Sequence, residues 1–488
     1  MKKQLLSITL FLSVIIANAQ TDTLFYFAAP EITKSGTGNF DRTIKLRITS
    51  YSLPTTITIS QPASPSFSAL LINIPPDSLY SVDLTSWIDS LENKPANTIL
   101  NYGLKIQSTS KVSIYYEVVS SFCNCNPEIF VLKGQTALGV DFWIPSQNLI
   151  DNSQGFLPVT NSSFDIVATQ NNTSVTIIPS RNIIGHGADT AFTIILNEGQ
   201  TYSAMAASGL AVQHLMGSRV TSNNPIAITI KDDDMRSLIF GTCSDLGGDQ
   251  IVPSPILGTE YIAINGGHLN NIGDQIFILA THDTTVIYQN GNSVDTINAG
   301  ETRQLDVGDS STFIVTSHPS SVLQISGIAC EYGIDILPQI NCTGSDSIAL
   351  ARSTTEPFYL NLLVPNGGQN GFLVNGNSGI INGAIFKQVP GTGGQWLSGQ
   401  LSLSTSVLPV GGAVLVTNPS TFHISVLHGG GTTGARFGYF SDFACPIVSG
   451  LPHLNPMQQL LIYPNPATSQ LNIRFSSEIL NASIEIYN

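Results

Sequence analysis

The run Asp232-Asp233-Asp234 is the densest group of side chains in this sequence that could bind a ligand. Carboxylate oxygens are the ligands that Ca²⁺ prefers, and Asp245 and Asp249 follow a short way further on. The ligand spacing of an EF-hand loop is absent, so a solvated acidic loop is the favoured interpretation and a calcium site is the alternative. These three aspartates form our only metal hypothesis, a calcium site.

The sequence offers no motif of a catalytic site. It has no Gly-x-Ser-x-Gly elbow with a partner base, and no Gly-Lys-Ser/Thr loop that would cradle a phosphate. The eight histidines are scattered, and no His pair has the spacing of metal ligands. Trp143 and Trp396 could line a sugar groove, although Trp143 also suits a core strand. We therefore predict no catalytic residue and no cofactor.

Six cysteines are candidates for disulfide bonds. An even number favours disulfide pairing if the chain is exported, which its ends predict, as described below. Zinc is the alternative, but Cys123 and Cys125 are separated by one residue, fewer than a zinc knuckle requires. The pairing stays open; Cys330–Cys342 is the simplest local pair, and a Cys123–Cys125 bond would close a strained ring. The candidates are Cys123, Cys125, Cys243, Cys330, Cys342 and Cys445.

Asp followed by Ser or Thr, and then by an apolar residue or Thr, recurs seven times. This pattern resembles the O-glycosylation acceptor that Bacteroidota use on exported proteins. Coincidence is the alternative explanation in a chain rich in these residue types. The resemblance implies the acceptors Thr23, Ser78, Ser90, Thr190, Thr284, Thr296 and Ser347.

Composition excludes some partners. Charged residues make up 11% of the 488 residues, and the net charge is −14. Nucleic acid and anionic membranes both require clustered Lys and Arg, so neither is an expected partner. Abundant Gly, Ser, Thr, Asn, Val and Ile favour many short strands joined by tight turns.

The strands that must position these side chains follow a repeated pattern. Four segments open with a strand rich in aromatic or branched residues, and three of them continue into a hairpin. Each segment closes on a polar turn and a last strand. The predicted opening strands are 24–27, 140–145, 260–264 and 358–363, and the closing turns and strands are 108–114, 221–228, 316–322 and 417–424.

Period-2 alternation in these strands predicts an all-β fold. We expect tandem antiparallel β-sandwich-like units, about four of them, since each has more strands than a propeller blade. A propeller-like ring is the alternative architecture. Disulfides just after the closing strands would stiffen the junctions between units.

The ends of the chain predict export. Lys2 and Lys3 precede an apolar run over 5–17, and Ala17-Asn18-Ala19 forms a small-residue cleavage site. This is typical of a cleaved signal peptide, because the run is shorter than the roughly 20 residues that span a bilayer. No other stretch is long and apolar enough, so no transmembrane segment is expected in the mature chain.

Near the C-terminus, a short apolar strand runs into a Pro-Asn-Pro turn. The residues Leu461, Tyr463, Pro464, Asn465, Pro466 and Ala467 resemble the type A sorting domain of the type IX secretion system. The resemblance implies the secretion machinery as a partner and the outer cell surface or medium as the location. Members usually continue through further strands, so a chain that stops at Asn488 is expected to hold an incomplete sorting domain, or to be a fragment.

The middle of the chain also resembles a known family. Phe142-Trp143-Ile144-Pro145, Ile166-Val167-Ala168-Thr169, Glu198-Gly199-Gln200-Thr201-Tyr202 and the strand from Gly217 to Ala227 are similar to the IgGFc-binding protein N-terminal domain, over about residues 100 to 330. The resemblance implies a surface or secreted protein. It assigns no binding residue here.

Together these features predict a secreted or cell-surface, non-enzymatic binding or adhesion protein whose ligand is an extracellular protein or glycan. A hydrolase of extracellular polymers and a structural surface-layer protein are the alternatives. The predicted organisation is a signal peptide over 1–19, β units over 20–122, 123–242, 243–342 and 343–447, a linker over 448–459 and the sorting domain over 460–488.

Overall fold

The computed structural model describes residues 21–34, 40–119, 126–236 and 238–443, and the backbone of two further strands, β31 (Leu460–Tyr463) and β32 (Asn472–Phe475). The chain divides into two compact units, Met1–Cys445 and Pro446–Asn488. Helix in the described residues is limited to short 3₁₀ turns, and none of them has the length and apolar character to cross a membrane. The turns are η1 (Thr85–Ser90), η2 (Gly134–Ala137), η3 (Ala211–Gln213), η4 (Ser254–Ile256) and η5 (Gly383–Ile385).

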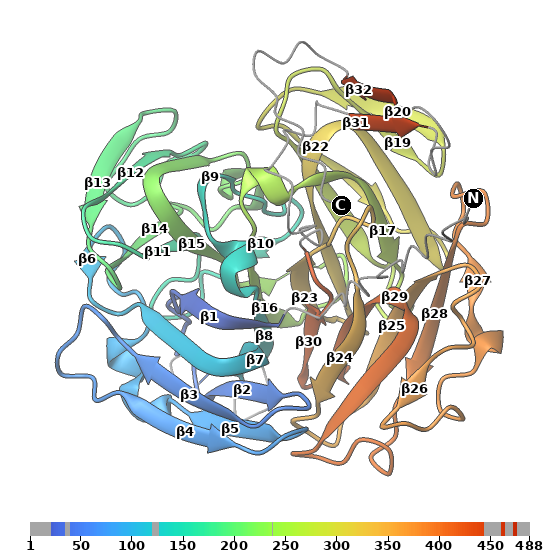
Figure 1. The fold of residues 1–488 in the computed structure, drawn as a ribbon. Helices are drawn as coiled ribbons and strands as arrows, with labels where there is room; N and C mark the ends of the chain where they lie inside the picture. Colours follow the sequence, from blue (N-terminus) through green and yellow to red (C-terminus); the bar gives the residue numbers. More distant parts are fainter. Residues whose placement is uncertain are drawn as a thin grey trace, which may run out of the picture. The chain divides into compact units, whose positions relative to one another are not determined.

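Four antiparallel sheets build the first unit (Figure 1). Sheet 1 contains β1 (Asp22–Phe27), β2 (Ile44–Ser50), β3 (Thr55–Ser60), β4 (Leu70–Ile74), β5 (Leu79–Asp83), β7 (Leu104–Val118) and β8 (Glu128–Leu132). Sheet 2 contains β6 (Ile99–Leu100), β9 (Gly139–Trp143), β10 (Asp151–Asn152), β11 (Ser162–Ala168), β12 (Thr173–Ile178), β13 (Phe192–Leu196), β14 (Thr201–Met205), β15 (Arg219–Arg236) and β16 (Ser244–Gln250).

Sheet 3 contains β17 (Gly258–Ile264), β18 (Gln275–Ala280), β19 (Thr285–Gln289), β20 (Asn292–Ile297), β21 (Thr302–Asp306), β22 (Ser311–Ile328) and β23 (Glu331–Ile336). Sheet 4 contains β24 (Ser345–Ala351), β25 (Phe358–Pro365), β26 (Leu373–Val374), β27 (Lys387–Gln388), β28 (Trp396–Ser402), β29 (Ala413–Gly430) and β30 (Gly434–Tyr439). The predicted all-β class with four repeated antiparallel units is confirmed. Two strands fall in a different unit from the one predicted. β8 pairs with β7 of sheet 1 and β16 pairs with β15 of sheet 2, whereas the predicted boundaries at 123 and 243 place each of them in the following unit.

One long strand organises each sheet. The N-terminal half of β15 pairs with β9 and β12, and its C-terminal half pairs with β11 and β16. The strands β7, β22 and β29 have the same role in the other sheets. Because its two halves pair with different neighbours, each long strand joins two sets of strands into one antiparallel sheet.

The polar segments that the sequence places in closing turns lie inside these long strands. In β15 the register with β9 jumps between Thr221 and Ile226, so the strand bends at Asn223-Asn224-Pro225 without ending. A proline is tolerated there because the bend needs no ladder hydrogen bond from its nitrogen. The prediction of a turn followed by a separate last strand is therefore wrong.

The opening strand of the fourth unit is also corrected. The strand β24 pairs with the N-terminal half of β29, which is the role of β17 in sheet 3. The predicted opener, 358–363, is β25 and pairs with the C-terminal half of β29, as β18 pairs with β22. Both segments are apolar, and only the pairing distinguishes them.

The last strand of each sheet lies at a common centre. These four inner strands are β8, β16, β23 and β30, and each contacts its neighbours around the centre (Figure 1). Their side chains are almost wholly buried on both faces. Small residues permit the close approach: a Cβ on Gly333 would lie 2.5 Å from Glu128 Oε2, closer than real contacts allow. The repeated units thus form a ring as well as a series.

Candidate binding site

A cleft opens where sheets 1 and 4 meet. Its larger hollow has a volume of about 600 Å³, and a second of about 320 Å³ shares Asp77 and Leu415 with it. Strands and turns of sheet 1, with the residue before β1, and strands of sheet 4 line the larger hollow. The residues from the sheet 1 side are Thr21, Thr23, Tyr51, Ser52, Leu53, Asp77, Thr109, Ser110 and Lys111, and those from sheet 4 are Asp346, Ser347 and Leu415.

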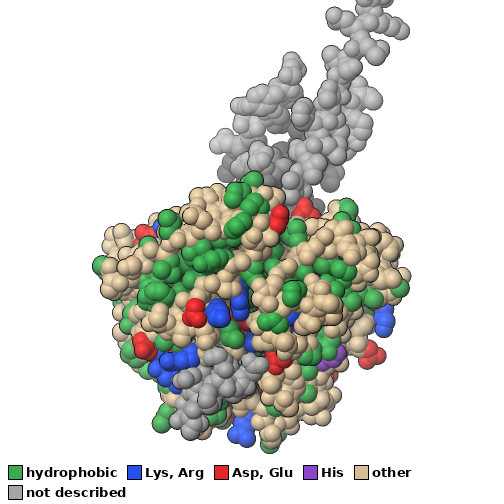
Figure 2. Space-filling view, turned by 90° about the horizontal axis from the view of Figure 1, so that it is seen from below, with side chains coloured by type: hydrophobic (Ala, Val, Ile, Leu, Met, Phe, Trp, Pro, Cys, Tyr) green, Lys and Arg blue, Asp and Glu red, His purple; other side chains and the backbone are tan. Residues whose placement is uncertain are grey.

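The lining combines hydroxyl groups, both signs of charge and apolar side chains. Burial raises the pKa of Tyr51 to about 12, and its hydroxyl is fixed by a 2.5 Å hydrogen bond with Ser113. Leu53 is 61% exposed, although leucine prefers burial. Figure 2 shows that hydrophobic side chains and uncharged surface, with scattered charged side chains, make up most of the described face seen from below Figure 1. The cleft could hold a segment that is partly apolar.

The centre of the ring holds buried carboxylates that join the inner strands. Glu128 accepts from the backbone N–H of Phe437 at 3.0 Å and of Ile334 at 3.3 Å. Asp249 accepts from Val131 at 3.2 Å, and Asp245 accepts from Tyr332 at 3.1 Å. These contacts replace the backbone ladder that the inner strands do not form with one another among the described residues.

These carboxyl groups are held away from water. Burial raises the pKa of Glu128, Asp245 and Asp335 well above the usual carboxyl range. Glu331 beside Asp245, and Asp249 beside Asp335, raise it further, because adjacent carboxylates resist being charged together. The glycosidase alternative would require an accessible carboxylate pair, and these pairs lie inside the protein.

We expect the protein to resist urea better at pH 5 than at pH 8. Burial raises the pKa of Glu92 to about 8, of Asp165 to about 7 and of Asp274 to about 6. A carboxyl group whose pKa is higher in the folded than in the unfolded protein makes its full contribution to stability below its unfolded pKa, which is near 4. The folded protein loses this contribution as the pH rises through the folded pKa. His423 and His428, with pKa lowered to about 3 by burial, act in the opposite direction but are fewer.

The variant Asp274→Asn is the control for this pH dependence. Its amide oxygen can still accept from Gly266 and Gln324, as Asp274 does at 2.9 Å. A neutral group cannot ionise, so the variant should gain up to about 3 kcal/mol over the parent at pH 8 and little at pH 4. A urea midpoint that is equal or higher at pH 8 in the parent would contradict the prediction.

The predicted calcium ligands lie near the end of β15 and are all buried. Asp232 accepts from Gln147 at 2.7 Å and from Asn152 at 2.6 Å, whereas Asp233 accepts from the N–H of Thr33 at 2.8 Å. Asp234 lies in the bulge between β15 and β16, and burial raises its pKa to about 7. In the described part of the chain, the three do not form one group of ligand atoms close enough for a metal ion. The favoured solvated loop is wrong, because the three side chains lie buried on β15. Calcium binding stays an untested alternative.

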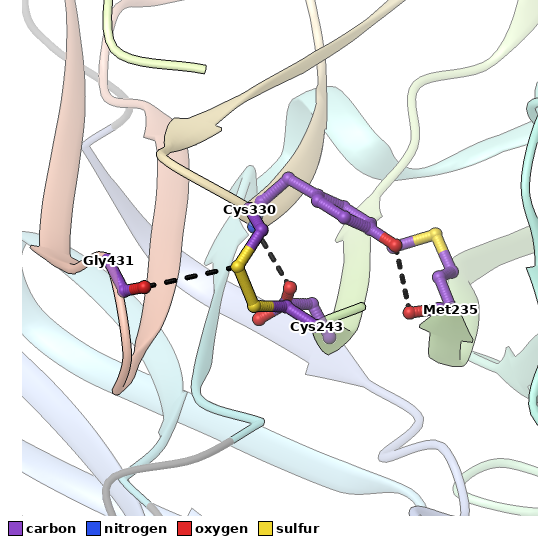
Figure 3. The surroundings of a disulfide bond; sticks show 6 residues. Met235, Cys243, Cys330 and Gly431 are labelled. Atoms are coloured by element: carbon purple, nitrogen blue, oxygen red, sulfur yellow. Dashed lines mark hydrogen bonds between the residues drawn. A yellow bond between two sulfur atoms is a disulfide. The ribbon is translucent and has the colours of Figure 1, made fainter. Parts of the chain in front are cut away.

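A disulfide joins Cys243, just before β16, to Cys330, in the turn between β22 and β23. It links the inner hairpins of sheets 2 and 3, and the carbonyl of Gly431 from the inner hairpin of sheet 4 lies 3.9 Å from Cys330 Sγ (Figure 3). The local Cys330–Cys342 pair is therefore wrong, although Cys342 is also disulfide-bonded. With Glu331 the two sulfur atoms form a possible metal group, but the disulfide occupies both thiols. Cys123, Cys125 and Cys445 lie outside the described residues.

The remaining sequence-predicted sites are placed as follows. Thr190, Thr284 and Thr296 are exposed; Thr23, Ser78, Ser90 and Ser347 are half-buried. O-glycosylation is not tested by this placement. The sorting residues Pro464, Asn465, Pro466 and Ala467 lie outside the described residues, and Leu461 and Tyr463 lie on β31, whose Tyr463 pairs with Asn472 of β32. The signal peptide, 1–19, also lies outside.

Sequence reasoning missed the cleft. Apart from Thr23 and Ser347, considered only as glycosylation acceptors, no residue of its lining carried a prediction of function; Thr109, Ser110 and Lys111 were only part of a predicted closing turn. Its walls come from segments more than 200 residues apart in the chain, such as those holding Leu53 and Leu415. No local pattern marks such a junction.

The fold and its site define an all-β protein of four repeated sheets, closed around an acidic centre, with an open cleft between sheets 1 and 4. The profile of the family described as IgGFc binding protein matches residues 128–427, and the chain belongs to that family. The resemblance found in the sequence ended near residue 330, whereas the family match extends to residue 427. A secretion system C-terminal sorting domain matches residues 461–488, so the protein is exported by the type IX system to the cell surface or the exterior. No curated protein matches the chain.

Proposed function

We propose that this protein is a non-enzymatic binding protein, secreted or held at the cell surface, that holds an extended segment of an extracellular protein in the cleft between sheets 1 and 4. The observation that carries the proposal is the cleft itself, with about 600 Å³ of open volume on a scaffold of buried strands. Binding residues are commonly carried by loops on rigid sheets.

The lining favours a polypeptide. Tyr51, Leu53 and Leu415 offer apolar contact, while Lys111 and Asp346 offer opposite charges. A peptide supplies apolar side chains, backbone carbonyls and charges together, which suits this mixture. The family description names the Fc region of IgG, so an Fc fragment belongs among the ligands to be tested.

We expect Leu53→Asp to weaken binding to the protein ligand at least 10-fold. Burying a leucine side chain contributes about 1.5–3 kcal/mol, and the substitution places a charge where an apolar contact is expected. The measurement is surface plasmon resonance of the secreted chain against the best ligand from an array of extracellular proteins that includes the Fc fragment.

Leu71→Asp is the matched control. Leu71 is 70% exposed on β4 of the same sheet and lies outside the cleft lining. Its substitution should leave affinity unchanged. Equal losses from both variants, or none from Leu53→Asp, would remove the cleft from the proposal.

A further inference from the structure

A second, shallower cleft lies between sheets 1 and 2, with a volume of about 470 Å³. Amide side chains predominate in its lining, which consists of Pro62, Ala63, Asn101, Asn171, Asn172, Asn197, Glu198 and Gln200. Most of the amides come from two adjacent turns of sheet 2, the β11–β12 turn and the β13–β14 turn.

The oxygens of these amides are committed to the turns. Asn171 Oδ1 accepts from the N–H of Glu198 at 3.1 Å, and Asn197 Oδ1 accepts from the N–H of Asn172 at 3.1 Å. Gln200 Oε1 accepts from the N–H of Asn197 at 2.9 Å. Because a backbone N–H can only donate, each amide is oriented with its oxygen toward the backbone and its NH₂ group away from it.

Sheet 3 builds the same pair of turns with carboxylates. Asp283 Oδ1 accepts from the N–H of Ala299 at 3.1 Å, as Asn171 does from Glu198. Glu301 Oε2 accepts from the N–H of Asn298 at 2.7 Å, as Gln200 does from Asn197. The turns therefore need only an acceptor at these positions. The amide NH₂ groups of sheet 2 are not required by the fold.

Several of these NH₂ groups are available to a ligand. Asn101, Asn171, Asn172 and Asn197 are exposed. None of their amide nitrogens donates to any residue in the described ranges, whereas Gln200 Nε2 donates to Asn101 Oδ1 at 3.0 Å. Glu198 adds one carboxylate, held by Tyr26 and Lys105 at 2.8 Å each.

We propose that this cleft between sheets 1 and 2 is a binding site for a neutral oligosaccharide. Ring, glycosidic and acetyl carbonyl oxygens of a sugar can only accept, and the free amide groups donate. A sugar hydroxyl can also donate to Glu198, whose pKa is lowered by its hydrogen bond with Lys105 so that it stays charged. That negative charge, with a net charge of −14, disfavours an anionic glycan.

The test is binding of the full secreted chain to immobilised neutral oligosaccharides of hexoses and N-acetylhexosamines, with sulfated and uronic-acid oligosaccharides alongside. The double variant Asn171→Asp with Asn172→Thr carries the side chains that sheet 3 has at these positions, Asp283 and Thr284, so the turn should be retained. It removes two donating groups. Each contributes about 0.5–1.5 kcal/mol, so affinity for the neutral glycan should fall about 10-fold.

Asn298→Asp is the matched control. It adds the same single negative charge in the equivalent turn of sheet 3 and keeps the acceptor for Thr284. It should bind like the parent. Binding to no neutral glycan, binding to anionic glycans alone, or a double variant that binds like the parent would each overturn the proposal. Leu53→Asp should leave glycan binding intact. The glycan proposal can therefore fail without affecting the proposal that the cleft between sheets 1 and 4 binds a polypeptide, and the reverse also holds.

Discussion

Replacing Cys243 and Cys330 together by serine is expected to lower the free energy of unfolding by about 4 kcal/mol. The bond closes a loop across a sequence separation of 87 residues, and a crosslink of that span removes much entropy from the unfolded chain. It also ties the inner hairpin of sheet 2 to that of sheet 3, close to the buried Tyr332, whose hydroxyl donates to the carbonyl of Met235 at 2.9 Å. The measurement is urea unfolding followed by circular dichroism.

Thr242→Ser is the control for this effect, since it changes an exposed residue of the same turn and should shift stability by less than about 0.5 kcal/mol. Reduction of the parent protein is less specific, because Cys342 is also disulfide-bonded. A loss below about 1 kcal/mol in the double serine variant would show that the inner strands hold together without the bridge.

The second large effect is expected from Glu117→Gln. Glu117 lies on β7 and is 1% exposed; its carboxylate meets Arg47 Nε at 2.7 Å and Arg436 Nε, from sheet 4, at 3.2 Å. Burial raises the pKa of Glu117, but the charges of Arg436 and then Arg47 outweigh it and hold the pKa below its usual value. Neutralising Glu117 leaves two buried guanidinium groups without their shared carboxylate, a change that costs about 3–5 kcal/mol.

The same chemical change at a more exposed ion pair is the control. Glu198→Gln removes the partner of Lys105, whose side chain is 22% exposed, and should cost less than about 1 kcal/mol. If both variants lose the same stability in urea, the buried triad of Arg47, Glu117 and Arg436 contributes no more than a surface pair.

Local patterns in the sequence predicted the strands well. Alternation in Ser174-Val175-Thr176-Ile177 places Val175 and Ile177 in the core and leaves Thr176 at the surface, as β12 shows. The signal depends on residues two apart in the chain, so no distant contact is needed to read it. Residues 222–225 show where prediction from local patterns fails. A polar segment ending in Asn-Pro looks the same in the sequence whether it forms a turn between strands or a bend within one strand, as it does in β15.

The sites depended on contacts that no local pattern encodes. Asp245 and Asp249 suggested loop ligands, yet both lie buried on β16, where their carboxylates accept hydrogen bonds from N–H groups of β23 and β8. Likewise, Cys243 pairs with Cys330 because two inner hairpins meet in the folded protein. Judged by separation in the sequence alone, Cys342 was the favoured partner of Cys330.

The export route, the all-β class and the fourfold repetition can be read from the amino-acid sequence, because short segments encode each of them: a terminal motif, period-2 alternation and repeated turns. The strands that meet at the centre, the pairing of Cys243 with Cys330 and the positions of the two clefts became evident only in the folded protein. These features arise between segments up to several hundred residues apart, and their positions are fixed by packing of the four sheets around the inner strands.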